Sequence, residues 1–280
     1  MLVVTSWGRR VLKTKSDARQ LLDSMGFYLL TIPLRRFSTR SDIHIVTGAD
    51  SSHCRSLINL LKTVQQYEPL ATVSIWNLGL SASELANIEL MFPNYELKFF
   101  DFDIHEPHMN ISINAGEYAW KPTIIASEAK NTERLVLWLD AGNILTQKLN
   151  WIRRFTKKKG FFSPFASGTL EDWTYPTMLE RYNVSSAMRK KPNLNGAIVA
   201  FSRSYPQADV LLQAWAECAQ NKDCIAPPGS NRNNHRQDQA ALSVLAYLQG
   251  MAPSGIQARS TSRLGIRIHQ DVELEPSSNL

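Results

Sequence analysis

The chain has 280 residues, of which 44% are hydrophobic and 20% are charged. This composition is that of an ordinary globular protein, and it excludes collagen-like, coiled-coil and wholly disordered chains. The formal net charge of +6 favours an anionic ligand. We expect the two dense basic runs, 157–159 and 189–191, to be solvated loops. Aromatic residues do not alternate with them as on a nucleic-acid surface, so we expect no nucleic-acid partner.

Residues 1–42 are polar and basic around one apolar stretch, and we expect them to form an N-terminal extension. The stretch, Phe27–Leu34, is too short to span a bilayer, and no small-residue cleavage site of a signal peptide follows it. The sequence therefore predicts no transmembrane segment. We expect a cytoplasmic protein and leave association with a membrane surface open.

From residue 43 onward, predicted strands and helices alternate. Runs rich in β-formers predict strands at 43–47, 72–76 and 95–100, and apolar residues at helical spacing predict a helix in each gap. Ser81 and Glu84 have the spacing of a capping box at the start of the second helix. This alternation predicts a parallel sheet with right-handed crossovers.

A near-continuous apolar strand, Leu135–Leu139, follows a helix that begins near Pro122. Such a strand is buried on both faces and belongs at the centre of the sheet. Further along the chain we expect strands at 161–164 and 196–201, a loop at 226–234, and helices at 175–182, 206–219 and 237–248. The sequence thus predicts an α/β fold, with a mostly parallel mixed sheet flanked by helices, in one domain over 43–270. Residues 271–280 are expected to be a C-terminal tail.

The three cysteines, Cys54, Cys218 and Cys224, fit neither a disulfide framework nor a structural zinc site. In one unbroken helix the Cα atoms of Cys218 and Cys224 would lie about 9 Å apart, beyond disulfide reach. The two can pair only if the helix ends between them, and Asn221 or Asp223 can end it. Such a bond would indicate an oxidising compartment, and hence a lumenal domain of the secretory pathway.

Polar residues follow both the first strand and the central strand, at the edge where open α/β sheets bind ligands. Gly48 lets a ligand approach the backbone closely, and Asp140 offers a carboxylate to a divalent cation or to ribose hydroxyls. The sequence contains no phosphate-binding P-loop and no GxGxxG, HExxH or GxSxG motif. Classical mononucleotide and dinucleotide folds, zinc peptidases and serine hydrolases therefore lack sequence support.

Five sequence blocks, in the right order, resemble the GT-A glycosyltransferases, and among them family 8, the group of glycogenin and the bacterial lipopolysaccharide galactosyltransferases. The blocks are Ile45–Asp50, Tyr118–Pro122, Leu137–Gly142, Leu194–Val199 and Gln237–Leu242. Their order and spacing over 43–248 carry the resemblance. The chain is also similar to an uncharacterised group of predicted nucleotide-diphospho-sugar transferases that carry an Asp-Ala-Gly in this position and a Cys-x5-Cys before the Asp-Gln helix.

The resemblance implies a GT-A-like fold and a hexosyltransferase-like enzyme. Such an enzyme moves a sugar from a nucleotide-sugar donor to a carbohydrate or glycoconjugate acceptor, with retention of configuration. It implies that Asp238 and Gln239 lie at the reacting sugar carbon. The Asn-Gly pair of the fourth block resembles the family's Asn-x-Gly strand on the acceptor side, and we include it among the donor contacts. The donor-binding residues expected are Thr47, Gly48, Asp50, Lys121, Asp140, Asn195 and Gly196.

One departure from the family bears on metal binding, because Gly142 stands where the second carboxylate of the Asp-x-Asp motif would be. The resemblance implies Mn2+ or Mg2+, with Asp140 as one ligand and His269 as a weaker candidate. Hard cations want several oxygens, and Asn143 offers only a neutral one. We therefore expect metal binding to depend on nucleotide. In metal-independent catalysis, cations such as Lys121 would stabilise the leaving diphosphate.

Two other functions remain open. The missing carboxylate favours a catalytically inactive nucleotide-sugar-binding protein on the same fold. A sugar nucleotidyltransferase would share the sheet topology but needs a Gly-rich basic loop after the first strand, which residues 51–55 do not provide.

Overall fold

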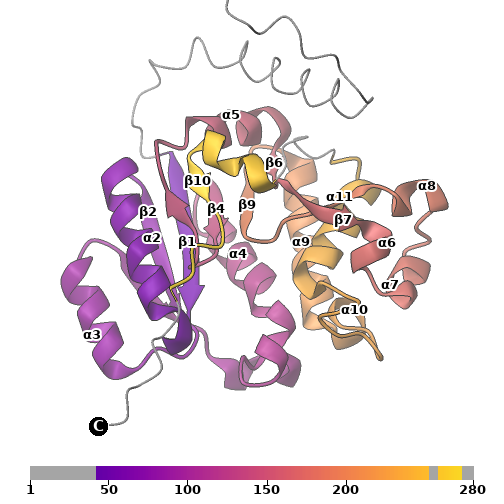
Figure 1. Ribbon diagram of the computed structural model, residues 1–280, viewed down its shortest axis with the longest axis horizontal. Helices are drawn as coiled ribbons and strands as arrows, with labels where there is room; N and C mark the ends of the chain where they lie inside the picture. Colours follow the sequence, from indigo (N-terminus) through magenta and orange to yellow (C-terminus); the bar gives the residue numbers. More distant parts are fainter. Residues whose placement is uncertain (1–41, 252–257, 273–280) are drawn as a thin grey trace, which may run out of the picture. The chain divides into compact units, whose positions relative to one another are not determined.

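The computed structural model describes residues 42–251 and 258–272 (Figure 1). The predicted N-terminal extension therefore lies outside the described residues, apart from Asp42, as does the predicted tail from residue 273. No helix in the described part is long and apolar enough to cross a membrane.

A six-stranded sheet, in the order β3-β2-β1-β4-β9-β6, forms the centre of the fold. Its strands are β1 (Ile43–Ala49), β2 (Thr72–Asn77), β3 (Glu96–Phe99), β4 (Leu135–Leu139), β6 (Phe161–Phe162) and β9 (Ile198–Phe201). The first four are parallel to one another, and β9 runs antiparallel to both β4 and β6. The predicted fold class, a mostly parallel mixed sheet flanked by helices, is confirmed.

Two small antiparallel sheets were not predicted. They pair β5 (Ile144–Leu145) with β10 (Ile266–Arg267), and β7 (Phe165–Thr169) with β8 (Pro192–Leu194). Strands of two to five residues are too short to show a clear hydrophobic period.

The helices connect the strands and cover the sheet (Figure 1). They are α2 (Cys54–Tyr67), α3 (Ala82–Met91), α4 (Trp120–Lys130), α5 (Asn150–Lys159), α6 (Leu170–Trp173), α7 (Pro176–Arg181), α8 (Ser186–Arg189), α9 (Pro206–Gln220), α10 (Lys222–Ile225) and α11 (Gln237–Leu248). Short 3-10 turns lie at η3 (Ser51–His53), η4 (Phe102–Ile104), η5 (Pro107–Met109), η6 (Asn114–Tyr118) and η7 (Ala258–Leu264).

The predicted capping box at the start of α3 is present, with Ser81 accepting from the Glu84 N–H and the Glu84 side chain accepting in return. The prediction of a loop at 157–159 was wrong, because these lysines form the last turn of α5. Gly160, in the left-handed conformation at φ 76°, ends that helix. Basic side chains are favourable there because they face the negative end of the helix dipole.

The sheet is buried on both faces. On one face Val46, Val136 and Trp138 belong to an apolar cluster that includes side chains of α4, α9 and α11. On the other face Ile45 and Leu137 are fully buried as well. Every residue of β1 and β4 is buried, which explains the near-continuous apolar sequence of β4.

The strand order reverses direction between β1 and β4, since β2 lies on one side of β1 and β4 on the other. Loops that leave neighbouring parallel strands in opposite directions open a crevice at their carboxyl ends. The fold therefore places the residues after Ala49 and after Leu139 side by side.

Candidate active site

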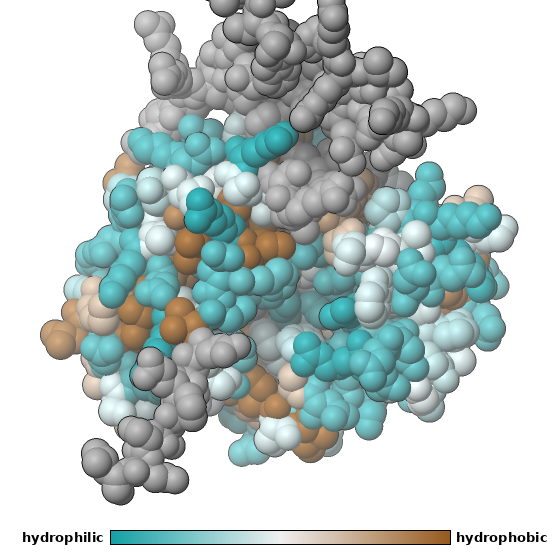
Figure 2. Space-filling model, viewed as in Figure 1, coloured by the Kyte–Doolittle hydropathy of each residue, from teal (hydrophilic) through white to brown (hydrophobic). Residues whose placement is uncertain are grey.

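A cleft of about 1070 Å³ opens at this reversal point. Its walls come from the ends of β1 and β4, from β7, from the loop before α11 and from the segment after β10, as the lining residues show: Gly48–Asp50, Asp140–Asn143, Phe165–Thr169, Asn195–Ala197, Arg236–Gln239 and Ile268–His269. Figure 2 shows the molecular surface hollowed near its centre, with hydrophilic residues around the hollow.

Lys121 lies at the floor of the cleft and joins its two principal carboxylates. Its Nζ is 3.0 Å from Asp140 Oδ1 and 3.2 Å from Asp238 Oδ2, and it donates to the Gly196 carbonyl at 3.3 Å. The side chain is 5% exposed and lies among the rings of Tyr118, Trp120 and Trp138. The ion pairs thus bring together three residues that lie far apart in the sequence.

Burial of Lys121 disfavours its charged form, but the charges of Asp140 and Asp238 outweigh it and raise the pKa of Lys121. Lys121 is the second residue of α4, where the positive end of the helix dipole also opposes a cation. The ammonium group is therefore held by the two carboxylates, and it remains charged at neutral pH.

Asp140 leaves the end of β4 with its carboxylate half-exposed. Trp138 Nε1 donates to Asp140 Oδ1 at 2.6 Å, and the Asp140 N–H donates to the Ala197 carbonyl at 3.0 Å. One carboxylate oxygen is therefore held by Trp138 and Lys121, which leaves the other for a ligand in the cleft.

Asp238, in the first turn of α11, is 5% exposed. Burial is the main reason why its pKa is raised; Lys121 lowers it and the like charge of Asp140 raises it further. Despite the ion pair, Oδ2 has no hydrogen bond of good geometry within the described residues. A carboxylate in this position can stabilise positive charge that develops on a bound molecule.

Gly196 makes this arrangement possible. A Cβ at this residue would lie 3.0 Å from Asp238 Oδ2. The Gly196 N–H donates to Gln239 Oε1 at 3.3 Å, so Gln239 is fixed beside Asp238. Asn195, 6% exposed, turns its Oδ1 back to accept from the Ala197 N–H at 2.8 Å. Its carboxamide therefore stabilises the turn that carries Gly196.

The end of β1 and the residues that follow it line another wall of the cleft. A Cβ at Gly48 would make a tight contact, 3.1 Å from the Trp76 carbonyl oxygen. Asp50 accepts from Ser52 Oγ at 2.6 Å and lies 2.7 Å from His53 Nδ1. The hydrogen bond from His53 is the largest cause that holds the pKa of Asp50 at about 2, and the same bond raises the pKa of His53.

Thr47 does not reach the cleft. It is fully buried in β1, and its Oγ1 has no hydrogen-bond partner among the described residues. The other expected donor contacts, from Gly48 to Gly196, all line the cleft.

Several lining residues were not predicted from the sequence. Arg232 lies over the Tyr118 ring at 5.2 Å, and Arg236 over the Trp173 ring at 4.1 Å. Tyr118 closes η6, in which all five residues have positive φ. Only one of the five is a glycine, so no composition signal marks this left-handed turn.

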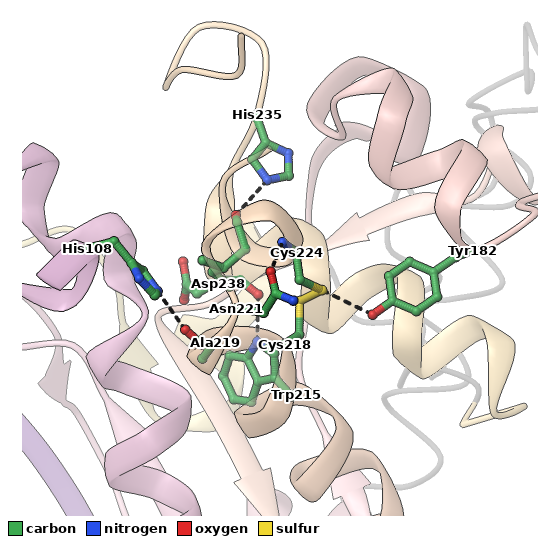
Figure 3. The surroundings of a disulfide bond; sticks show 10 residues. His108, Tyr182, Trp215, Cys218, Ala219, Asn221, Cys224, His235 and Asp238 are labelled. Carbon is green, nitrogen blue, oxygen red and sulfur yellow. Dashed lines mark hydrogen bonds between the residues drawn. A yellow bond between two sulfur atoms is a disulfide. The ribbon is translucent and has the colours of Figure 1, made fainter. Parts of the chain in front are cut away.

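A disulfide between Cys218 and Cys224 lies near Asp238, below the surface of the cleft (Figure 3). α9 ends at Gln220, Asn221 caps both it and α10, and the Cα atoms of Cys218 and Cys224 come within 5.2 Å. Of the two residues able to end the helix, Asn221 does so. Trp215, on the same helix α9, donates its Nε1–H to the Asp238 carbonyl at 2.8 Å.

His235 secures the loop that leads to Asp238. Its Nδ1 accepts from the Tyr175 N–H at 3.1 Å, so the proton is on Nε2, which donates to the Ile225 carbonyl at 2.9 Å. Burial lowers the pKa of His235. Both ring nitrogens are satisfied by the neutral form.

The cleft also has oxygen groups that fit a hard divalent cation. Asp140 and Asp271 present carboxylates, and Asn143, 1% exposed, has an Oδ1 without a hydrogen-bond partner in the described chain. His269 lines the same cleft with an exposed side chain. Across residues 42–251 and 258–272, no three His, Cys, Asp or Glu side chains cluster closely enough to hold a metal ion unaided.

No protein-family model matches the chain, and no curated protein matches it. Solved structures do resemble it. The galactosyltransferase LgtC, in complex with donor and acceptor sugar analogues, is 16% identical with a TM-score of 0.45, over 72% of this chain and 70% of that one. The bifunctional glycosyltransferase WbbM is 12% identical with a TM-score of 0.46, over 75% of this chain and 38% of WbbM, so the chain spans well under half of that protein.

A third similar structure is core-mannan synthase A from Aspergillus fumigatus in its Mn/GDP form. It is 6% identical with a TM-score of 0.48, over 76% of this chain and 72% of that one.

Proposed function

We propose that the chain is a GT-A-type glycosyltransferase that moves a sugar from a nucleotide-sugar donor to a carbohydrate or glycoconjugate acceptor. The observation that carries the proposal is the placement of Lys121 between Asp140 and Asp238, within 3.2 Å of both, in a cleft at the strand-order reversal. These residues belong to three of the five sequence blocks that resemble the family.

In this proposal the nucleotide binds along the wall formed by Gly48 and Asp50, and Asp140 contacts the ribose or a donor-bound cation. The donor leaves as a nucleoside diphosphate, so negative charge grows on its oxygens as the bond to the sugar breaks. A buried cation already in place stabilises that charge without having to reorganise, and loss of one such group typically costs about 100- to 1,000-fold in rate. Lys121 takes this role.

Asp238 and Gln239 attend the reacting sugar carbon. Glycosyl transfer passes through a transition state with positive charge on this carbon, and a nearby carboxylate stabilises it. Asp238 is suited to this because it is buried at the cleft floor and Lys121 opposes the rise in its pKa. Retention of configuration is the stereochemistry that we propose from the resemblance. The acceptor binds toward Trp173 and Arg236, which stack on each other and line the cleft.

The Cys218–Cys224 bond supports an oxidising compartment, such as the lumen of the secretory pathway, over the cytoplasm. Mass spectrometry of peptides from unreduced protein, purified from its natural source, tests this. A linked 218–224 peptide supports the lumenal location, and free thiols there favour the cytoplasmic one.

A thermal-shift screen of UDP, GDP, ADP and CDP, each with and without Mn2+, tests whether the cleft binds donor nucleotides. A nucleotide at a hundred times its Kd should add about 2.7 kcal/mol to the free energy of unfolding. No shift with any of them would contradict the proposal.

A second function, nucleotide-sugar binding without catalysis, is favoured by one observation, the absence of a carboxylate at Gly142. Calorimetry combined with an assay for released nucleoside diphosphate separates the two functions. Binding of a nucleotide sugar without release of its sugar, in the presence of Mn2+ and sugar acceptors, would identify the binding protein.

A further inference from the structure

The space where a side chain at Gly142 would stand is already filled by a carboxylate from another part of the chain. A Cβ built on Gly142 would lie 2.2 Å from Asp271 Oδ1, 2.5 Å from its Cγ and 2.6 Å from its Oδ2. A side chain at residue 142 fits only if the Asp271 carboxylate moves away. The turn after β4 has no carboxylate at residue 142, but the Asp271 carboxylate, from the segment after β10, lies beside this residue.

The backbone holds Asp271 in this position from both sides. On one side the Gln270 N–H donates to the Gly142 carbonyl at 2.6 Å. On the other the Val272 N–H donates to Ser56 Oγ, at the start of α2, at 2.9 Å. Asp271 thus stands between two hydrogen bonds, one to the turn after β4 and one to the helix that follows β1.

A second observation concerns the next residue of the same turn. Asn143 lines the cleft next to Gly142, is 1% exposed and has an Oδ1 with no hydrogen-bond partner within the described residues. A buried amide oxygen without a partner is costly unless something binds it. Its neighbours Asp140 and Asp271 line the same cleft, so anionic and neutral oxygens, the ligands that Mg2+ and Mn2+ prefer, occur together.

We propose that Asp271 supplies the second carboxylate of a divalent-cation site, together with Asp140. The described protein groups are too few to hold the ion alone, so the cation binds with the diphosphate of the donor, which completes its shell of oxygens. This inference rests on the proposed function, because it requires a nucleoside diphosphate in the cleft.

The test compares four proteins: the wild type, Asp271→Ala, the relocated variant Gly142→Asp/Asp271→Ala, and the control Glu89→Ala. The control loses the same charge from an exposed position on α3, outside the cleft. Mn2+ is titrated into each protein, saturated with UDP or with GDP, and free Mn2+ is followed by electron paramagnetic resonance. Nucleotide affinity in EDTA is measured in parallel by calorimetry.

We expect Asp271→Ala to bind Mn2+ at least about tenfold more weakly than the wild type, given that even outer-shell changes cost about 10- to 100-fold. The relocated variant should recover most of the loss, and Glu89→Ala should match the wild type. Equal Mn2+ affinity in Asp271→Ala and the wild type would overturn the proposal. If Gly142→Asp/Asp271→Ala binds Mn2+ as weakly as Asp271→Ala does, the claim that a carboxylate at residue 142 can take the place of the Asp271 carboxylate is overturned.

If neither UDP nor GDP binds the wild type, ADP and CDP are used instead. If none of the four binds, with Mn2+ or in EDTA, the proposed function fails, and the two failures are thereby distinguished. A further arm needs no nucleotide. Gly142→Ala should lower the Tm of the otherwise wild-type protein, and the loss should disappear in Gly142→Ala/Asp271→Gly, since the clash is gone. If Gly142→Ala lowers the Tm equally in the wild type and in the Asp271→Gly protein, the Asp271 side chain does not occupy the space beside Gly142.

Discussion

Replacing Lys121 with methionine removes the cation between Asp140 and Asp238 while keeping a side chain of similar length. Losing one partner of a buried ion pair costs about 3–5 kcal/mol, because the other charge stays buried alone. The Asp140 side chain is 38% exposed and is therefore partly stabilised by water, whereas that of Asp238 is only 7% exposed. Most of the cost therefore comes from Asp238. We expect Lys121→Met to lower the free energy of unfolding by about 3 kcal/mol, near the lower end of that range.

The loss of stability in Lys121→Met should depend on pH. Burial already raises the pKa of Asp238 above its ordinary value of 3.8, and without Lys121 it rises further. A carboxyl group with a raised pKa binds protons on folding, so the stability of Lys121→Met should fall as pH rises from about 4 through the raised pKa. The variant should thus be closest to the wild type in acid and furthest from it at pH 8.

Urea denaturation at pH 5 and pH 8 measures this, and Lys130→Met, at an exposed position of the same helix, is the matched control. The double variant Lys121→Met/Asp238→Asn should regain much of the stability because no buried charge is left unpaired. Donor turnover should be about 100- to 1,000-fold lower in both Lys121 variants. A Lys121→Met protein as stable as Lys130→Met at both pH values would refute the reasoning.

Three further outcomes follow from the site. Cys218→Ser/Cys224→Ser should lose about 2 kcal/mol of unfolding free energy, the value for so short a loop, and chemical denaturation with no change in midpoint would contradict it. Gly196→Ala should lower turnover about 10- to 100-fold at unchanged nucleotide affinity, since its Cβ displaces the Asp238 carboxylate; unaltered steady-state rates would count against that contact. Because burial lowers the pKa of His235 below 6.5, the wild type should lose stability as pH falls from about 6.5 toward that lowered pKa, and His235→Gln should not; identical Tm profiles from pH 5 to 7.5 would rule this out.

The sequence was most informative where burial sets the pattern. β4 is buried along its whole length, so its apolar run marked it as the central strand, and the β-formers of 43–47 marked β1. The polar residues that follow both strands could then be recognised. The capping box of α3 was readable because both of its partners lie within one helical turn. Asp140 was found from its place after the central strand, whereas Lys121 and Asp238 were found through the resemblance and reach Asp140 from α4 and α11.

Other parts of the site could not be read from the sequence. Asp271 reaches Gly142 only through a segment whose hydrophobic pattern is weak, so no periodicity marks its return to β4. The left-handed turn at 114–118 carries a single glycine, and its Glu117 side chain accepts a long-range hydrogen bond from Gln237 Nε2 at 3.2 Å. The cysteine pair was left open because the sequence did not decide whether the helix ends between Cys218 and Cys224; Asn221 ends it.

Release of nucleoside diphosphate from a panel of nucleotide sugars, with sugar acceptors and Mn2+ present, tests the central claim most directly. The account predicts that the wild type turns over at least one donor, and that Asp238→Asn loses that turnover while still binding the nucleotide. Turnover of no donor, release of pyrophosphate from nucleoside triphosphates, or full activity in Asp238→Asn would contradict it.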